Sequence, residues 1–242
     1  MNASRLPEST HEVDHMSEGR IPIDQSDLWT LLPDSGLVVI CGPDDAAKGA
    51  LEAALTEVRE NAFIRMINQK SESDVTSWFR TEGGDKDPKL FFIADVEGGQ
   101  AIEACVYAAA AGKTVVVRLR GSQAIGYALR DMMAAEGSIM SRYPGMTLRS
   151  LLLESLHAIA DPRLVKTPDG GPVMCISYLR LDARMRDLYR NAEHDEWPRL
   201  TEALLSGGAE GTRSLSAHAD ALLSLGRITR EMREILRLVG AP

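Results

Sequence analysis

Three short apolar runs constrain the fold of this chain more than any other feature. They are GLVVIC at residues 36–41, LFFIA at residues 90–94 and TVVVRL at residues 114–119. None alternates between apolar and polar residues, as a strand with one solvated face would. Segments rich in Ala, Leu and Glu, which favour helices, separate the runs. Apolar strands joined by helices are typical of a parallel sheet covered on both faces, so this part of the chain is predicted to be α/β.

Helices are predicted between these strands and throughout the later sequence. Before residue 122 we expect helices over residues 46–60, 71–80 and 100–111, and a short strand over residues 62–67. From residue 122 we expect helices over residues 122–135, 147–160, 182–191, 197–206, 214–225 and 229–238, with a strand or hairpin arm over residues 172–181. The predicted parts are an arm over residues 1–27, an α/β unit over 28–145 and a helical unit over 146–242.

Charge and hydropathy exclude some functions. The 242 residues are 44% hydrophobic and carry a formal net charge of −8, which disfavours binding to nucleic acid. No window approaches the roughly 18 apolar residues that cross a bilayer. Residues 1–20 are polar and lack the apolar core of a secretory signal. We therefore expect a cytoplasmic protein with no membrane insertion.

No metal centre is predicted from the cysteines or histidines. Cys41, Cys105 and Cys175 lie far apart in apolar stretches, which favours reduced core thiols over a disulfide framework or a metal site. His157 lies on the helix predicted over residues 147–160, with no second ligand at a useful spacing. We expect it at the edge of the core.

A candidate phosphate loop follows the first apolar run. Residues 42–50 (GPDDAAKGA) lie where a P-loop G-x-x-x-x-G-K-[ST] would lie, between a strand and a helix. Gly42 and Lys48 match the pattern. Ala47 replaces the second glycine, and Gly49 replaces the hydroxyl residue that would hold Mg²⁺. The motif is therefore incomplete in two of its four defining positions.

Two acidic residues in the same segment leave its role open. Asp44 and Asp45 place negative charge beside a site that would bind a polyanion. One of them could occupy the N–H cradle as an internal phosphate mimic and pair with Lys48. Alternatively, the segment is a plain strand-to-helix turn whose acidic first turn suits the helix dipole.

Several stretches resemble the secretion ATPase superfamily, most closely the PilT-like type IV pilus retraction ATPases and the type IV secretion ATPases. Residues 93–113 align with the family's Walker B strand and the helix after it. Residues 152–159 (LLESLHAI), 186–190 (RDLYR) and 226–229 (GRIT) resemble three later family motifs. The resemblance covers roughly residues 30–240. It implies a RecA-like P-loop core with a mostly parallel sheet, a helical C-terminal subdomain and assembly into hexameric rings. In the family a PAS-like domain precedes the motor domain, and we expect this chain to lack it.

The resemblance also implies that the catalytic positions are replaced. Asp95 falls where the family has its Walker B glutamate, and its carboxylate is one methylene shorter. The acidic Asp box falls near residues 67–69, where the amides Asn68 and Gln69 replace both carboxylates, and Arg120 replaces the His-box histidine. Asp95 is either a residual general base or a strand-end residue bound by backbone donors. Arg118 and Arg120 either clamp a phosphate or a partner carboxylate, or form a solvated strand end.

Three alternative functions follow from these features. The leading one is a catalytically degenerate relative of a pilus or secretion ATPase, without a cofactor, that binds an active paralogous ATPase, a pilus or secretion base protein, or itself. The second is a divergent but active ATPase that uses Lys48 and Asp95 with ATP and Mg²⁺. The third is a regulatory domain that binds another anion at the Lys48 loop or at Arg118 and Arg120.

Overall fold

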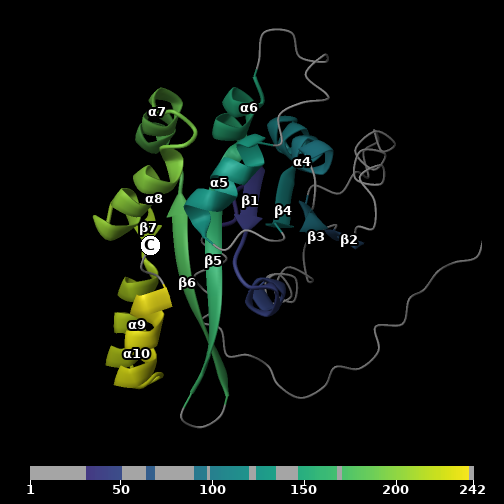
Figure 1. Ribbon diagram of the computed structural model, residues 1–242. Coiled ribbons are helices and arrows are strands. Elements are labelled where there is room, and N and C mark those ends of the chain that lie inside the picture. Colours follow the sequence, from purple (N-terminus) through teal and green to yellow (C-terminus); the bar gives the residue numbers. More distant parts are fainter. Residues whose placement is uncertain are drawn as a thin grey trace, which may run out of the picture.

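A seven-stranded sheet forms the centre of the protein in the computed structural model (Figure 1). The structure describes residues 31–50, 64–68, 90–96, 99–119, 124–134, 147–167 and 171–239. The strands are β1 (Gly36–Ile40), β2 (Ile64–Asn68), β3 (Leu90–Val96), β4 (Thr114–Leu119), β5 (Leu156–Lys166), β6 (Pro172–Arg180) and β7 (Thr212–Arg213). The helices are α4 (Gly99–Ala110), α5 (Ile125–Ala134), α6 (Leu148–Ser155), α7 (Ala183–Asn191), α8 (Trp197–Ser206), α9 (Leu215–Ser224) and α10 (Arg230–Val239). Residues 44–50 are also helical.

The sheet is mostly parallel, as predicted. Its strand order is β2-β3-β4-β1-β5-β6-β7. The four pairings β2–β3, β3–β4, β4–β1 and β1–β5 are parallel. The pairings β5–β6 and β6–β7 at one edge are antiparallel. The α/β fold class is therefore confirmed, and β1 lies in the interior of the sheet.

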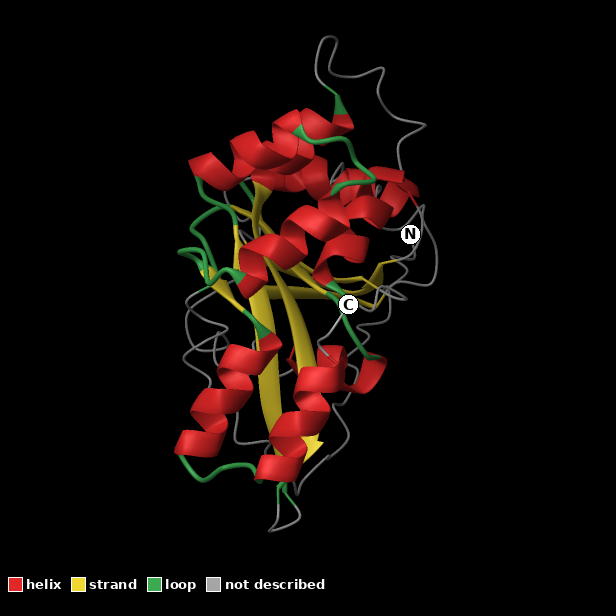
Figure 2. Cartoon of the chain, turned by 60° about the vertical axis from the view of Figure 1, so that its left-hand side comes forward, coloured by secondary structure: helices red, strands yellow, loops and turns green. Residues whose placement is uncertain are grey.

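Burial on both faces explains why the central strands do not alternate. Leu37 and Val39 of β1 point into a core formed with α4, α5 and α6. Val38 and Ile40 point to the opposite face, where they pack with residues of the helix at 44–50. A third apolar cluster lies between β6 and the α9–α10 pair, beside the long β5–β6 hairpin (Figure 2).

The helix predicted over residues 147–160 is wrong in its second half. Helix α6 ends at Ser155, whose hydroxyl donates to the carbonyl of Leu151 at 2.7 Å, and β5 begins at the next residue. His157 therefore lies on a strand. The apolar residues after position 155 fit a helical stripe and a strand buried on both faces equally well, and pairing with β1 selects the strand.

This strand also changes the expected organisation of the second unit. Residues 146–242 contribute β5, β6 and β7 to the sheet, so this part of the chain is not wholly helical. The sheet continues across the expected boundary at residue 145, because β5 pairs directly with β1.

Most other expected elements are confirmed, and cap residues account for several helix starts. The expected helices over 100–111, 122–135, 182–191, 197–206, 214–225 and 229–238 correspond to α4, α5, α7, α8, α9 and α10. Thr229 caps α10, since its hydroxyl accepts from the Met232 N–H at 3.2 Å. The helix expected over 71–80 and the arm over 1–27 lie outside the described residues. Within the described part, no helix is both long and apolar enough to cross a bilayer.

We expect replacement of the α7 cap to cause a moderate loss of stability. Asp182 accepts from the Met185 N–H at 2.7 Å, so Asp182→Ala should lower the free energy of unfolding by about 1 kcal/mol. Asp182→Asn keeps an acceptor and should lose less. Urea unfolding of both variants tests this, and equal losses would show that the cap is not responsible.

Candidate functional site

The candidate phosphate loop is short because the helix begins early. Residues 41–43 connect β1 to the helix at residues 44–50. The N–H of Cys41 donates to Ala160 of β5 at 2.9 Å, and the N–H of Ala47 donates to Pro43 at 2.8 Å. The positions that would wrap a phosphate in a P-loop are therefore wound into a helical turn, and the Ala47 N–H is used within the helix.

A buried carboxylate packs directly against this loop. Gly42 has φ +100°, and a Cβ at this position would lie 2.4 Å from Asp161 Oδ1 and 3.2 Å from the Pro162 carbonyl oxygen. Asp161 Oδ2 accepts from Arg163 at 2.8 Å, whereas Oδ1 is buried without a hydrogen-bond partner among the described residues. Burial raises the pKa of Asp161, and the hydrogen bond and charge of Arg163 oppose that shift.

The two loop aspartates lie at the surface, at the start of the helix. The Asp44 side chain is 65% exposed. Asp45 is also exposed, and its carboxylate accepts from the N–H of its neighbour Ala46 at 2.8 Å. This arrangement favours the acidic first turn over an internal phosphate mimic. Lys48 lies one turn further along, with an exposed side chain.

Arg118 is the sequence-predicted residue that the structure brings to the loop. It extends from β4, is only 7% exposed, and donates from Nη1 to the backbone carbonyl of Asp44 at 3.0 Å. Arg118 is therefore not a solvated strand end. Arg120 lies outside the described residues. Asp95 belongs to β3, and its side chain also lies outside the described part.

The prediction of core thiols is confirmed for the three cysteines. Cys41, Cys105 and Cys175 are buried and free. Burial raises the pKa of Cys105 and of Cys175 to about 12, so both are thiols at neutral pH. Among the described residues, no group of three His, Cys, Asp or Glu side chains is placed to hold a metal ion.

Asp161 is the site residue that sequence reasoning missed. The interpretation of residues 147–160 as one helix hid the strand that places Asp161 beside Gly42. A signal was available, because the run at residues 156–160 ends in a carboxylate just as the run before Asp95 does. At the carboxyl end of a parallel strand, such a residue points to the ligand-binding edge of an α/β sheet.

Comparison with known proteins identifies relatives of this chain. No family model matches it. The type IV pilus retraction ATPase PilT of Pseudomonas aeruginosa is 24% identical over 219 residues, which cover 81% of this chain and 61% of PilT.

Solved structures give the same result at the level of the fold. The ATPase DotB of Legionella pneumophila matches with a TM-score of 0.70 at 16% identity, over 89% of this chain and 64% of DotB. DotB of Yersinia pseudotuberculosis matches with a TM-score of 0.68 at 18% identity, over 90% and 64%. The pilus retraction motor PilT with bound ADP gives 0.62 at 16% identity, over 84% and 62%.

The sequence match to PilT and the shared fold agree with the mostly parallel α/β sheet of this chain. The chain spans somewhat less than two thirds of the length of these relatives. It is a relative of the PilT-like pilus and secretion ATPases.

Proposed function

We propose that this chain is a non-hydrolysing relative of the pilus and secretion ATPases that works by binding protein partners in such a machine. The observation that carries the proposal is the early start of the helix at Asp44. It converts the positions of the phosphate loop into a helical turn directly after a three-residue connection.

The residues around the loop do not fit Mg²⁺ and a nucleotide. Gly49 has no hydroxyl for the metal, and the Ala47 N–H is already used by Pro43. The Asp161 carboxylate packs on Gly42, where a phosphate would approach. Its negative charge, although partly balanced by Arg163, disfavours a phosphate at this position.

The contacts of Arg118 point the same way. A phosphate clamp needs a guanidinium that is available to the ligand. Here Nη1 of Arg118 donates to the Asp44 carbonyl and lies 4.0 Å from the Asp44 carboxylate. Arg118 therefore holds the start of the helix in place, and this contact favours a structural role over a role in hydrolysis.

The proposed partners are an active PilT-like ATPase, a base protein of the pilus or secretion machine, or further copies of this chain. A relative that shares the motor fold can occupy a subunit position without turnover. It would then cap, dilute or regulate a ring of active subunits.

Phosphate release from ATP tests the absence of hydrolysis. We expect no turnover above buffer, at least about a hundredfold below a PilT-like ATPase assayed in parallel, since loss of one positioned catalytic group costs about that much. Lys48→Ala should change nothing, and neither should Lys113→Ala, a control at the opposite end of the parallel strands. Turnover that Lys48→Ala alone abolishes would establish the divergent-ATPase alternative instead.

Native mass spectrometry tests the binding role. The chain is mixed with an active PilT-like ATPase from the same cell, and we expect mixed oligomers that contain both proteins. If the chain remains monomeric both alone and in mixtures with the ATPase and base proteins, subunit binding is wrong.

A further inference from the structure

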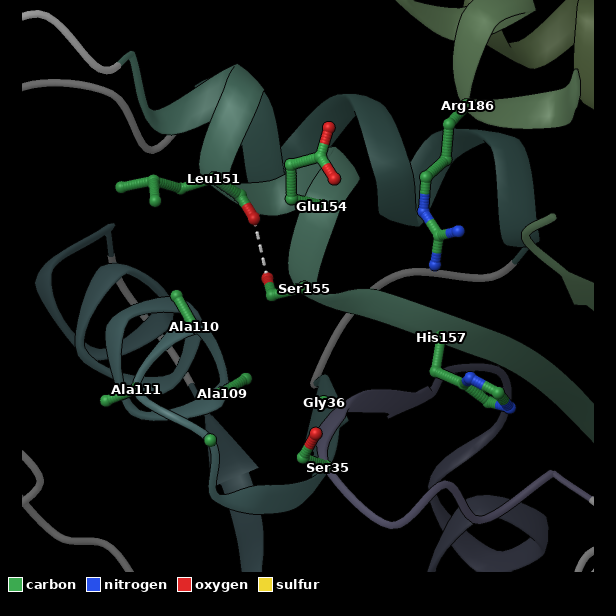
Figure 3. A pocket seen from close by; sticks show the side chains of 11 residues that line it. Ser35, Gly36, Ala109, Ala110, Ala111, Leu151, Glu154, Ser155, His157 and Arg186 are labelled. Carbon is green, nitrogen blue, oxygen red and sulfur yellow. Dashed lines mark hydrogen bonds between the residues drawn. The ribbon is translucent and has the colours of Figure 1, made fainter. Parts of the chain in front are cut away.

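A cavity lies at the end of the sheet opposite the Gly42 loop. Its volume is about 440 Å³, and it opens beside Ser35 and Gly36, where β1 begins (Figure 3). Gly42 follows the other end of β1, six residues later, which corresponds to about 20 Å along a strand. The cavity is therefore separate from the candidate phosphate loop and plays no part in the proposed function. Its size lies in the range of small-molecule sites.

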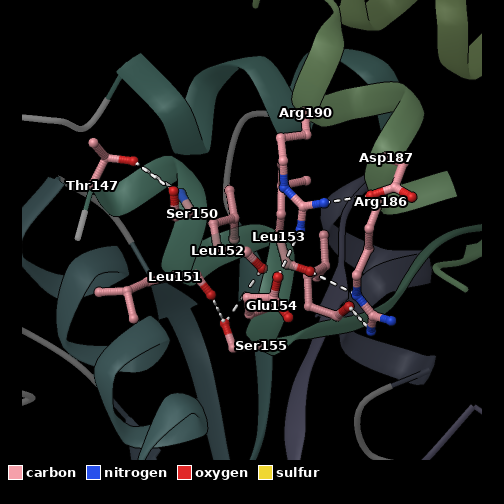
Figure 4. Close-up of polar contacts among 11 residues, drawn as sticks. Thr147, Ser150, Leu151, Leu152, Leu153, Glu154, Ser155, Arg186, Asp187 and Arg190 are labelled. Atoms are coloured by element: carbon pink, nitrogen blue, oxygen red, sulfur yellow. Dashed lines mark hydrogen bonds and ion pairs between the residues drawn. The ribbon is translucent and has the colours of Figure 1, made fainter. Parts of the chain in front are cut away.

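One wall of the cavity is polar and carries a fixed guanidinium. Arg186 of α7 donates from Nε to the Leu153 carbonyl at 2.7 Å and from Nη2 to the Leu156 carbonyl at 3.1 Å (Figure 4). These bonds hold the side chain across the junction between α6 and β5. Its third nitrogen, Nη1, makes no hydrogen bond within the described part of the chain and remains for a ligand. An anchored guanidinium is suited to bind a carboxylate without losing side-chain freedom.

His157 of β5 lies on the same wall and has an unused ring nitrogen. Its Nε2 is buried without a hydrogen-bond partner among the described residues. Burial lowers the pKa of His157, and the charges of Arg180 and Arg186 lower it further. The ring is therefore neutral at pH 7 and can donate from one nitrogen. An anion beside it would offset the two arginines and favour its protonation.

The nearby acidic group is already paired. Glu154 lines the cavity, and its carboxylate accepts from Arg190 at 2.7 Å (Figure 4). Arg190 also pairs with Asp187, so these three side chains carry one net negative charge at the surface. Arg180 and Arg186 give the His157 wall two positive charges. The local field at this wall therefore favours an anion.

The other wall is apolar, and its residues are small except for one leucine. It consists of the C-terminal end of α4 and the turn after it, residues 109–112, together with Leu151 of α6 (Figure 3). The N–H groups of Gly112 and Lys113 donate to the carbonyls of Ala109 and Ala108, at 3.0 and 3.1 Å, which satisfies part of the helix end. Small side chains leave room for an apolar group.

We propose that this cavity binds a small ligand that carries a carboxylate on an apolar body. The carboxylate accepts from Arg186 and lies near the His157 ring, and the apolar body lies against the end of α4. The ligand is either a free carboxylic acid or the C-terminal residue of a peptide.

Nuclear magnetic resonance of the His157 ring in the full chain tests the proposal. The probes are benzoate, its neutral isostere benzamide, inorganic phosphate and an acetylated dipeptide ending in a free carboxylate. We expect a saturable shift of the His157 signal with benzoate, at a dissociation constant on the order of 1 mM for so small a ligand. Benzamide should bind about tenfold more weakly, because it lacks the charge-assisted hydrogen bonds. The His157 pKa should rise when benzoate is bound.

Two variants outside the polar wall keep the test independent of Arg186, whose removal would also disturb the α6–β5 junction. Ala111→Trp fills the cavity from an exposed turn and should weaken benzoate binding at least about tenfold. Ala183→Trp, exposed on α7 outside the cavity, is the matched control and should leave binding unchanged.

Each result decides for or against the site. A shift with the dipeptide as well as with benzoate supports a peptide terminus, whereas a shift with benzoate alone supports a free acid. The proposal is wrong if benzoate produces no saturable shift of the His157 signal at concentrations up to about twentyfold above the expected dissociation constant. It is also wrong if benzamide binds equally well, if phosphate binds and benzoate does not, or if Ala111→Trp has no effect.

Discussion

Gly42→Ala is expected to lower the free energy of unfolding by about 2–5 kcal/mol. Part of the loss is backbone strain, because φ is +100° at this position. An added Cβ would also lie 2.4 Å from Asp161 Oδ1. Asp161 cannot move away freely, since Arg163 holds its other oxygen and the side chain is only 10% exposed.

Gly112→Ala separates these two contributions. Gly112 has φ +89°, and nothing lies within 4 Å of an added Cβ. It should therefore lose only the strain, about 1–2 kcal/mol. Urea unfolding of both variants measures the difference. Equal losses would mean that the contact between Asp161 and the loop is not tight, and would remove one support for the proposed lack of nucleotide binding.

Arg163→Ala is expected to lower the free energy of unfolding by about 3–5 kcal/mol at neutral pH. The Arg163 side chain is 16% exposed and donates to Asp161 at 2.8 Å. Its removal leaves a buried carboxylate without a counter-charge, which costs more than the pair itself contributes. Adding Asp161→Asn removes that charge and should recover a large part of the loss.

The pH dependence of these variants gives a second measurement. In the folded protein the pKa of Asp161 is raised by burial above its usual 3.8. The folded state therefore holds this proton more tightly than the unfolded state, and the stability that protonation contributes is present at acid pH and lost as pH rises through the folded pKa. Without Arg163 that pKa rises further, so the stability gap between Arg163→Ala and the native chain should widen from pH 4 to pH 7.

The Asp161→Asn background provides the matched control for this trend. The double variant has no carboxylate at position 161, so its stability relative to Asp161→Asn alone should not change between pH 4 and pH 7. A gap that widens equally in that background would assign the pH dependence to another group.

The edge of the sheet around Gly42 combines three features that support the proposed lack of hydrolysis. The helix starts early, a buried carboxylate packs on the glycine, and Arg118 is bound to the backbone of the helix start. Under the proposed function, each of these features disfavours a phosphate at this edge. The relatives named above are described as ATPases, so the proposed loss of hydrolysis is a difference from them that a single assay can decide.

The local sequence determined most of the elements of this protein. Apolar runs without alternation predicted β1, β3 and β4, and β1 and β4 are buried along their whole length. Side chains that cap helix starts, such as Thr229, fixed helix boundaries through local hydrogen bonds. The mostly parallel sheet and the resemblance to the pilus and secretion ATPases also followed from the sequence.

Only the tertiary structure decided that residues 156–160 form a strand, and which side chains that strand positions. A short apolar run carries no period that separates a buried strand from a buried helix, and its partner β1 lies more than a hundred residues earlier in the chain. That pairing places Asp161 against Gly42 and His157 in the lining of the cavity. These contacts join distant segments through the sheet register. The carboxylate after residues 156–160 could mark a strand end, but no local pattern says which strand lies beside it.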